Sequence, residues 1–190
     1  MFRILPAYSL VMVLMFGTLA WSGLNAGDQG PDFTGVGVDG ETHSLETLSK
    51  DAAALVICFT CNHCPVAVAY EDRFIEFSDE YKDQAVRFVA INCNKAADLE
   101  EMKNRADLKG FNFPYVRDET AVSARAYSAS VTPHLFVLDG DGNVAYQGAF
   151  DDDMNKPKTM FVKDAVDAVL AGEAPAVANT EPFGCTIQLK

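Results

Sequence analysis

Hydrophobic positions along the chain follow two different periods, which predict strands alternating with helices. Residues 52–59 form a continuous apolar run, Ala-Ala-Ala-Leu-Val-Ile-Cys-Phe, that is too short for a core helix. A run of this length is typical of a strand buried on both faces. After it, large apolar side chains recur every three or four positions, at Val66, Tyr70, Phe74, Phe77 and Tyr81. This spacing predicts an amphipathic helix, and Pro65 suits its first turn because a proline lacks the N–H that would be unpaired there.

The rest of the chain continues the alternation. The pattern predicts a strand at Val86–Ile91 and then a helix through Leu99, Met102 and Ala106 that is closed by Gly110. It next predicts a short helix that is capped by Asp118 and runs to Tyr127. Two strands, at Leu135–Leu138 and Val144–Tyr146, are joined by the turn Asp139-Gly140-Asp141-Gly142-Asn143, and a last helix through Phe161, Ala165, Val166 and Val169 ends at Gly172. The Gly-rich residues 31–40 predict a small entry hairpin. A parallel crossover followed by a hairpin predicts one α/β domain over residues 27–172, with a mixed sheet covered by helices on both faces. Residues 173–190 show no period, and we expect a surface tail there.

The first 26 residues have the composition of an export signal. Arg3 gives a positive start, residues 4–21 are almost entirely apolar, and Leu24-Asn25-Ala26 offers a small residue for cleavage. Without cleavage, the same stretch just reaches the length of a membrane anchor. In either case we expect the domain to lie outside the cytosol, in the periplasm or beyond the cell.

Composition narrows the range of functions. Hydrophobic residues make up 49% of the 190-residue chain, so the core does not need disulfides or metals to support it. The formal charge of −12 argues against nucleic-acid binding, which needs clustered Lys and Arg. The five cysteines are therefore available for chemistry.

Two of these cysteines form the motif Cys61-Asn62-His63-Cys64, between the predicted buried strand and the amphipathic helix. A helix N-terminus stabilises a thiolate and lowers its pKa from roughly 8.5 to about 3.5–7.5. We assign Cys61, expected to be the more exposed, as the nucleophile, and Cys64 as the thiol that resolves a mixed disulfide. A protonated His63 would add positive charge beside the thiolate.

Other uses of the cysteines fit the spacing less well. A zinc site would need a second Cys or His pair with matching spacing, and none is present in the sequence. Cys58 extends the spacing to C-x2-C-x2-C, as in some iron–sulfur proteins, but the usual fourth Cys before a Pro is missing. We expect Cys58 and Cys93 to be buried packing residues, and we expect no metal and no cofactor.

Thr132-Pro133 precedes the strand at residues 135–138. A proline there removes a donor from the sheet and suits a tight turn, in which the peptide bond could be cis or trans.

From about residue 30 the chain resembles the thioredoxin superfamily. The similarity is to the redoxin or AhpC/TSA-like branch, and within it to a peroxiredoxin-like group of exported bacterial proteins. The matching pieces are Phe59 to Pro65, Ile91-Asn92, Phe113-Pro114-Tyr115, Asp118-Glu119-Thr120, Thr132-Pro133, Phe136, Asp151-Asp152 and Phe183-Gly184-Cys185-Thr186-Ile187. The resemblance implies a thioredoxin-like fold and a cis Pro133 that faces the dithiol. It also implies that Thr132 and Pro133 flank Cys61 and offer backbone groups to a substrate. We expect Thr60 and Asn62 to contribute to the same substrate site.

The chain departs from this resemblance at informative positions. Peroxiredoxins carry Pro-x-x-x-Thr/Ser-x-x-Cys before the reactive cysteine, whereas counting back from Cys61 gives Cys58 and Ala54. They also carry an Arg where Pro133 stands here. Thioredoxins have a Trp before the first cysteine, and this chain has Thr60. The dithiol motif and Pro133 thus resemble those of thioredoxins, whereas the surrounding residues resemble those of peroxiredoxins.

Three functions follow as hypotheses. The first is a dithiol–disulfide oxidoreductase acting on protein or small-molecule thiols and disulfides, with Cys61, Cys64, His63 and Pro133 in the active site. The second is a thiol peroxidase that uses Cys61. The third is a Cu(I) carrier with Cys61, Cys64 and either His63 or His134 as ligands. Cys185 either relays a disulfide to the motif or is a free thiol in the tail.

Overall fold

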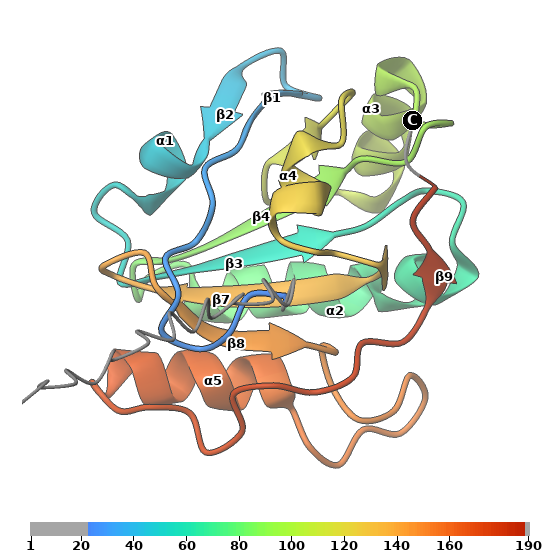
Figure 1. The fold of residues 1–190 in the computed structure, drawn as a ribbon. Coiled ribbons are helices and arrows are strands. Elements are labelled where there is room, and N and C mark those ends of the chain that lie inside the picture. Colours follow the sequence, from blue (N-terminus) through green and yellow to red (C-terminus); the bar gives the residue numbers. More distant parts are fainter. Residues whose placement is uncertain (1–22, 189–190) are drawn as a thin grey trace, which may run out of the picture.

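The computed structural model describes residues 23–188 and shows a seven-stranded mixed sheet between two layers of helices (Figure 1). The strands are β1 (Thr34–Gly37), β2 (Thr42–Ser44), β3 (Ala54–Phe59), β4 (Val86–Asn92), β5 (Tyr115–Arg117), β6 (Val131–Thr132), β7 (His134–Asp139), β8 (Val144–Gly148) and β9 (Cys185–Thr186). The helices are α1 (Leu45–Ser49), α2 (Pro65–Tyr81), α3 (Leu99–Lys109), α4 (Val122–Ala126) and α5 (Phe161–Leu170).

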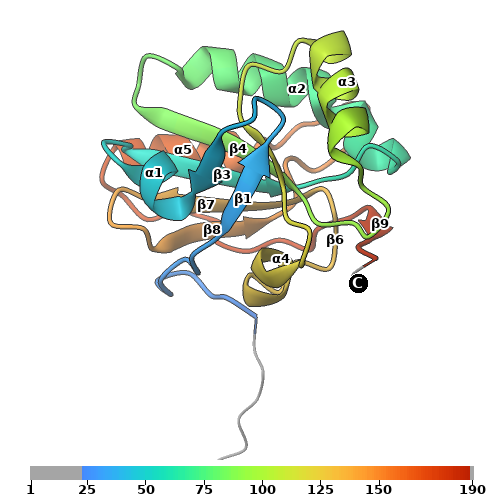
Figure 2. The ribbon, with the colours of Figure 1, turned by 90° about the horizontal axis from the view of Figure 1, so that it is seen from above.

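The sheet has the strand order β2-β1-β5-β4-β3-β7-β8. The central strand β3 pairs in parallel with β4 and antiparallel with β7. Every residue of β3 is buried, as its unbroken apolar run predicts. The α/β fold with a mixed sheet is therefore confirmed. The short strands β6 and β9 form a separate two-stranded sheet at one end of the molecule (Figure 2).

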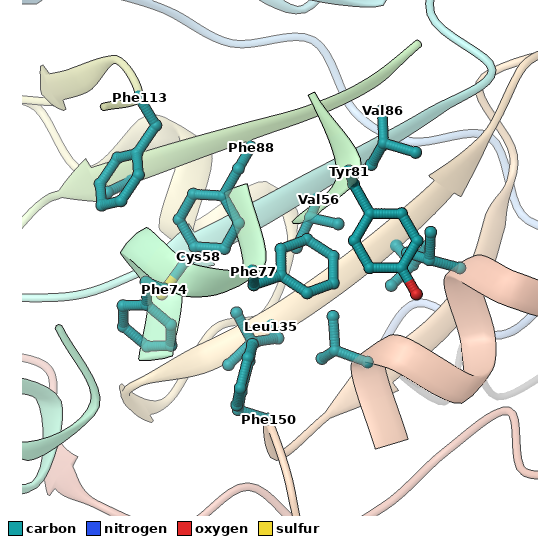
Figure 3. Packing of buried hydrophobic residues seen from close by; sticks show 14 of the residues in the cluster. Val56, Cys58, Phe74, Phe77, Tyr81, Val86, Phe88, Phe113, Leu135 and Phe150 are labelled. Carbon is teal, nitrogen blue, oxygen red and sulfur yellow. The ribbon is translucent and has the colours of Figure 1, made fainter. Parts of the chain in front are cut away.

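Two hydrophobic clusters hold the helices against the sheet. Alternate residues of β3 point to opposite faces, so Val56 and Cys58 belong to one cluster while Ile57 and Phe59 belong to the other. The first cluster packs α2, α3 and α5 against the sheet and contains tilted and edge-on aromatic rings, among them Phe74, Phe77, Phe88 and Phe150 (Figure 3). The second packs α4 and the partly buried α1 against the other face. Each fully buried ring stabilises the fold by about 1.5–3 kcal/mol.

The helix boundaries follow from local chemistry. α2 begins with Pro65 at its first position, as predicted. Asp98 caps α3 by accepting the Glu101 amide at 3.0 Å, and Gly110 ends it with a φ of 72°. α4 differs from the prediction, because it begins only at Val122, after Ala121 with a φ of 54°. The Asp118 carboxylate nevertheless accepts the Ser123 amide at 2.9 Å.

Other parts of the fold also differ from the pattern-based prediction, and the short elements α1, β6 and β9 were not predicted. β5 was not predicted, because three residues are too short to show a period. The entry hairpin extends beyond residue 40, since its second strand is β2. The tail lies on the surface along most of its length, yet it is fixed to the domain: Thr180 donates its amide to Gln147 at 3.0 Å, and Ile187 is buried. The tail that we expected on the surface is thus attached to the domain near its end.

The predicted export signal lies almost entirely outside the described residues. Within residues 23–188, no helix has both the length and the apolar character needed to cross a bilayer. The segment just before the domain packs on it, because Leu24 contacts the second cluster and Gly27 donates its amide to Val144 at 2.8 Å.

Candidate active site

Cys61 and Cys64 lie in the short loop between the end of β3 and the start of α2. Cys64 is the residue that caps α2, and its sulfur accepts the Ala67 amide at 3.4 Å. Both thiols are largely covered, and Cys61 is the more exposed at 5% against 1% for Cys64. The helix amide that we expected to stabilise a Cys61 thiolate is thus bonded to Cys64.

The Thr132–Pro133 loop lies against both sulfurs. Its peptide bond is cis, the isomer that the resemblance implies. The Thr132 hydroxyl lies 4.0 Å from the Cys61 sulfur, and the Thr132 carbonyl accepts the Cys64 thiol at 3.0 Å. One residue therefore contacts the predicted nucleophile and the predicted resolving thiol at the same time.

Cys185 joins this group from the far end of the chain. Its sulfur lies 2.6 Å from the sulfur of Cys64, and it packs on the small cluster formed by Cys61, Cys64 and Ala67. β9 carries Cys185 to this place by pairing with β6, in a register that sets Cys185 opposite Thr132. The site is thus a set of three thiols.

The surroundings make these thiols unequal in acidity. Burial raises the pKa of Cys64, but hydrogen bonds from Cys185, the Thr132 side chain and the Ala67 amide outweigh burial and leave this pKa below its usual value. The hydrogen bond to Cys64, together with partial burial, raises the pKa of Cys185 to about 11. Cys64 is therefore the more acidic thiol of this pair.

The other two cysteines are packing residues in the position that the sequence predicts. Cys58 is fully buried in β3, and this burial raises the pKa of its thiol well above the usual range. Burial, with the charge of Asp118 as a smaller cause, raises the pKa of Cys93 to about 12. Both stay protonated near neutral pH and are poor nucleophiles.

The two residues between the motif cysteines bind partners on other elements. The Nε2 atom of His63 lies 2.7 Å from Glu101 of α3, with both side chains about half exposed. The Asn62 side chain accepts the Tyr115 hydroxyl at 2.6 Å, and that hydroxyl accepts Asn92 at 3.0 Å. The motif loop is therefore tied to β4 and β5.

Tyr115, Asn92 and Glu101 were not assigned to the site from the sequence. Tyr115 and Asn92 do stand in two of the matching pieces of the family resemblance, which was the available signal. Nothing in the local pattern marks Glu101. Thr60 lies buried at the end of β3 and donates its amide to Ile91 at 2.9 Å.

His134, one of the ligands of the copper hypothesis, is buried beside the site. It pairs with Phe59 across β3 and β7, and its ring lies 4.6 Å from that of Phe136. Burial lowers the pKa of His134 to about 4, so the ring is neutral near pH 7. In the part of the chain that the structure describes, no group of three His, Cys, Asp or Glu residues is placed to hold a metal ion.

Comparisons with known proteins agree with this fold. The family model described as "AhpC/TSA family" matches residues 26–147. A hypothetical protein from Sinorhizobium meliloti 1021 is 30% identical, with 89% of this chain and 97% of that chain covered and a TM-score of 0.82. An uncharacterized conserved protein from Geobacillus kaustophilus is 36% identical, with 87% and 92% covered and a TM-score of 0.82.

A more distant structure shows the fold alone. The thiol:disulfide interchange protein, thioredoxin family protein, from Chlorobium tepidum TLS is 23% identical, with 75% of this chain and 96% of that chain covered and a TM-score of 0.61. A comparison with curated proteins found no match. The seven-stranded mixed sheet has the thioredoxin-like architecture. Since the family model spans well over half of its length, the chain belongs to the AhpC/TSA family, a redoxin family of the thioredoxin superfamily that acts on thiols or peroxides.

Proposed function

We propose that the protein is a thiol–disulfide oxidoreductase that acts outside the cytosol, with Cys61 as the attacking thiol and Cys64 as the resolving thiol. The observation that carries this proposal is the contact of both sulfurs with Thr132, next to a cis proline and at the start of a long helix. A location outside the cytosol is proposed from the composition of residues 1–26.

The chemistry consists of two exchange steps. The Cys61 thiolate attacks one sulfur of a client disulfide, forms a mixed disulfide, and releases the first client thiol. The Cys64 thiolate then attacks the Cys61 sulfur and releases the second client thiol. The client disulfide gains two electrons, and the two protein thiols lose them. The lowered pKa of Cys64 supports the second step, because it favours the thiolate form of the sulfur that attacks the mixed disulfide.

Neighbouring side chains hold the loop in place for these steps. The Thr132 carbonyl fixes the Cys64 sulfur, and the Tyr115 hydroxyl fixes the Asn62 side chain between the two cysteines. A loop tied on both sides presents the sulfurs in one geometry, which lowers the entropic cost of forming the mixed disulfide.

Reduction of a disulfide-bonded protein such as insulin, with dithiothreitol as the electron donor, tests the proposal. We expect Cys61→Ser to lose nearly all exchange activity and Cys64→Ser to lose most of it. Cys93→Ala is the matched control, since it removes a buried thiol outside the exchange steps and should keep the wild-type rate. Undiminished activity of Cys61→Ser would overturn the proposal.

The peroxidase hypothesis lacks support from the structure around Cys61. Peroxiredoxins carry their Pro and Thr at the positions of Ala54 and Cys58, which here lie inside β3 with no exposed surface. Ala54 has no polar side-chain group, and the Cys58 thiol, only a weak donor, is fully buried. We therefore expect hydrogen peroxide to oxidise the reduced protein no faster than it oxidises free cysteine, as measured by stopped-flow spectroscopy.

A further inference from the structure

The three thiols of the site are arranged around Cys64 as the shared member. We propose that Cys185 is a second resolving thiol, which takes over the disulfide from Cys61, so that the oxidised protein rests with a Cys64–Cys185 bond and a free Cys61. The inference rests on the proposed function, and it adds a third redox residue, carried by the C-terminal tail.

The Cys64 and Cys185 sulfurs already lie close together. The sulfurs of Cys64 and Cys185 lie 2.6 Å apart, close to the roughly 2.05 Å of a covalent disulfide. A cysteine that only filled space in the tail would not need its sulfur directed at another thiol.

Backbone contacts of the tail bring Cys185 close to Cys64. β9 pairs with β6 so that Cys185 faces Thr132, whose carbonyl also accepts the Cys64 thiol. Gly184, with a φ of 156°, precedes Cys185, and a Cβ atom there would lie 2.0 Å from the Thr132 carbonyl oxygen. Only glycine permits the tail to come this close.

The tail is also fixed on both sides of Cys185. The Phe183 ring lies 6.2 Å from the Tyr70 ring of α2. On the other side, Ile187 is buried and donates its amide to Ser130 at 2.9 Å, while Lys95 donates its amide to Gln188 at 2.8 Å. Cys185 is therefore held at the site, and its approach to Cys64 does not depend on chance collisions of a loose tail.

The acidities of the two thiols set the order of the exchange steps. While Cys64 carries charge, its hydrogen bond keeps Cys185 protonated. Once Cys64 is consumed in the Cys61–Cys64 disulfide, that cause is gone and the pKa of Cys185 falls. Cys185 then attacks the Cys64 sulfur, and Cys61 departs as a thiolate.

The electrons balance over the full sequence. One client disulfide is reduced to two thiols, and the Cys64 and Cys185 thiols are oxidised to one disulfide. Cys185 gives up its proton, Cys64 reacts as a thiolate, and the two released client thiolates take up one proton from Cys185 and one from water, while Cys61 ends as it began. The relay thus separates the attacking thiol from the stored disulfide.

Disulfide mapping of the full-length wild-type protein tests the inference. The reduced protein is oxidised with glutathione disulfide, its free thiols are alkylated, and its non-reduced peptides are identified by mass spectrometry. We expect the Cys64 peptide to be linked to the Cys185 peptide, with Cys61 alkylated. A Cys61–Cys64 disulfide with alkylated Cys185 would overturn the inference.

Two variants sharpen the test. Oxidised Cys185→Ser should contain the Cys61–Cys64 bond. In oxidised, folded wild type, the free Cys61 thiol should react fast with a chromogenic disulfide. Oxidised Cys185→Ser should lack this fast-reacting thiol. Cys61→Ser should still form the Cys64–Cys185 bond when treated with the thiol oxidant diamide, and failure to do so would also count against the inference. The mapping shows which sulfurs bond and does not depend on turnover. A missing Cys64–Cys185 bond with normal, Cys61-dependent turnover overturns the relay alone, whereas turnover independent of Cys61 overturns the proposed function.

Discussion

The two disulfides that the site can form close loops of very different length, and this difference predicts their effects on stability. The Cys64–Cys185 bond joins residues 121 positions apart, whereas the Cys61–Cys64 bond closes a loop of about four residues. In the chain-entropy model the long loop stabilises the folded state by about 5 kcal/mol and the short one by about 2 kcal/mol. Oxidation of wild type should therefore stabilise the protein far more than oxidation of Cys185→Ser.

Thermal unfolding of oxidised and reduced samples measures this difference. For a domain of this size, 1 kcal/mol shifts the midpoint by about 2–4 °C. We expect oxidation to raise the midpoint by about 10–20 °C in wild type and by about 4–8 °C in Cys185→Ser. Cys93→Ala, which lacks a thiol elsewhere, should show the wild-type increase. Equal increases in wild type and Cys185→Ser would refute the reasoning, because they would mean that the short loop forms in both.

Two further predictions concern single residues near the site. Gly184→Ala should lower the free energy of unfolding by about 3 kcal/mol in urea titrations, since the added Cβ would overlap the Thr132 carbonyl. Gly110→Ala is the control, because Gly110 also has a positive φ but faces open space, and this variant should lower the free energy of unfolding by only about 1 kcal/mol. Equal losses in the two variants would contradict the proposed close approach. His134 has a folded-state pKa of about 4, below its usual 6.5, so the unfolded state binds the extra proton and stability falls as the pH drops from 6.5 to 4. The loss from this group should be about 3 kcal/mol, and His134→Phe should remove it; parallel pH profiles of wild type and variant would show that His134 does not titrate in this way.

Long periodic segments and the chemical motif were the most predictable parts of the molecule. The unbroken apolar run of β3 and the regular spacing in α2 could each be interpreted from the sequence, because each satisfies its own pattern locally. Their junction then placed Cys61 and Cys64 at the start of a helix. β5 is too short for such a pattern, and it exists because the neighbouring strands offer it hydrogen bonds.

The position of Cys185 could not be predicted from local patterns. It depends on pairing between β6 and β9, two-residue strands whose sequences show no strand period. That pairing in turn depends on a glycine that permits close backbone approach. The family resemblance marked Cys185 as part of a motif, but only the structure shows that its sulfur faces Cys64. The sequence also did not predict that the amide at the start of α2 donates to Cys64, since we expected it to stabilise Cys61.

The central claim is that Cys61 is the thiol that attacks the client. It is tested most directly in a protein that carries Cys64→Ser and Cys185→Ser, because neither resolving thiol can then release a mixed disulfide. Brief treatment of the reduced variant with glutathione disulfide, followed by peptide mass spectrometry, should show one glutathione attached to Cys61 and persisting for the length of the experiment. An unmodified Cys61, or a glutathione found only on Cys58 or Cys93, would contradict the account.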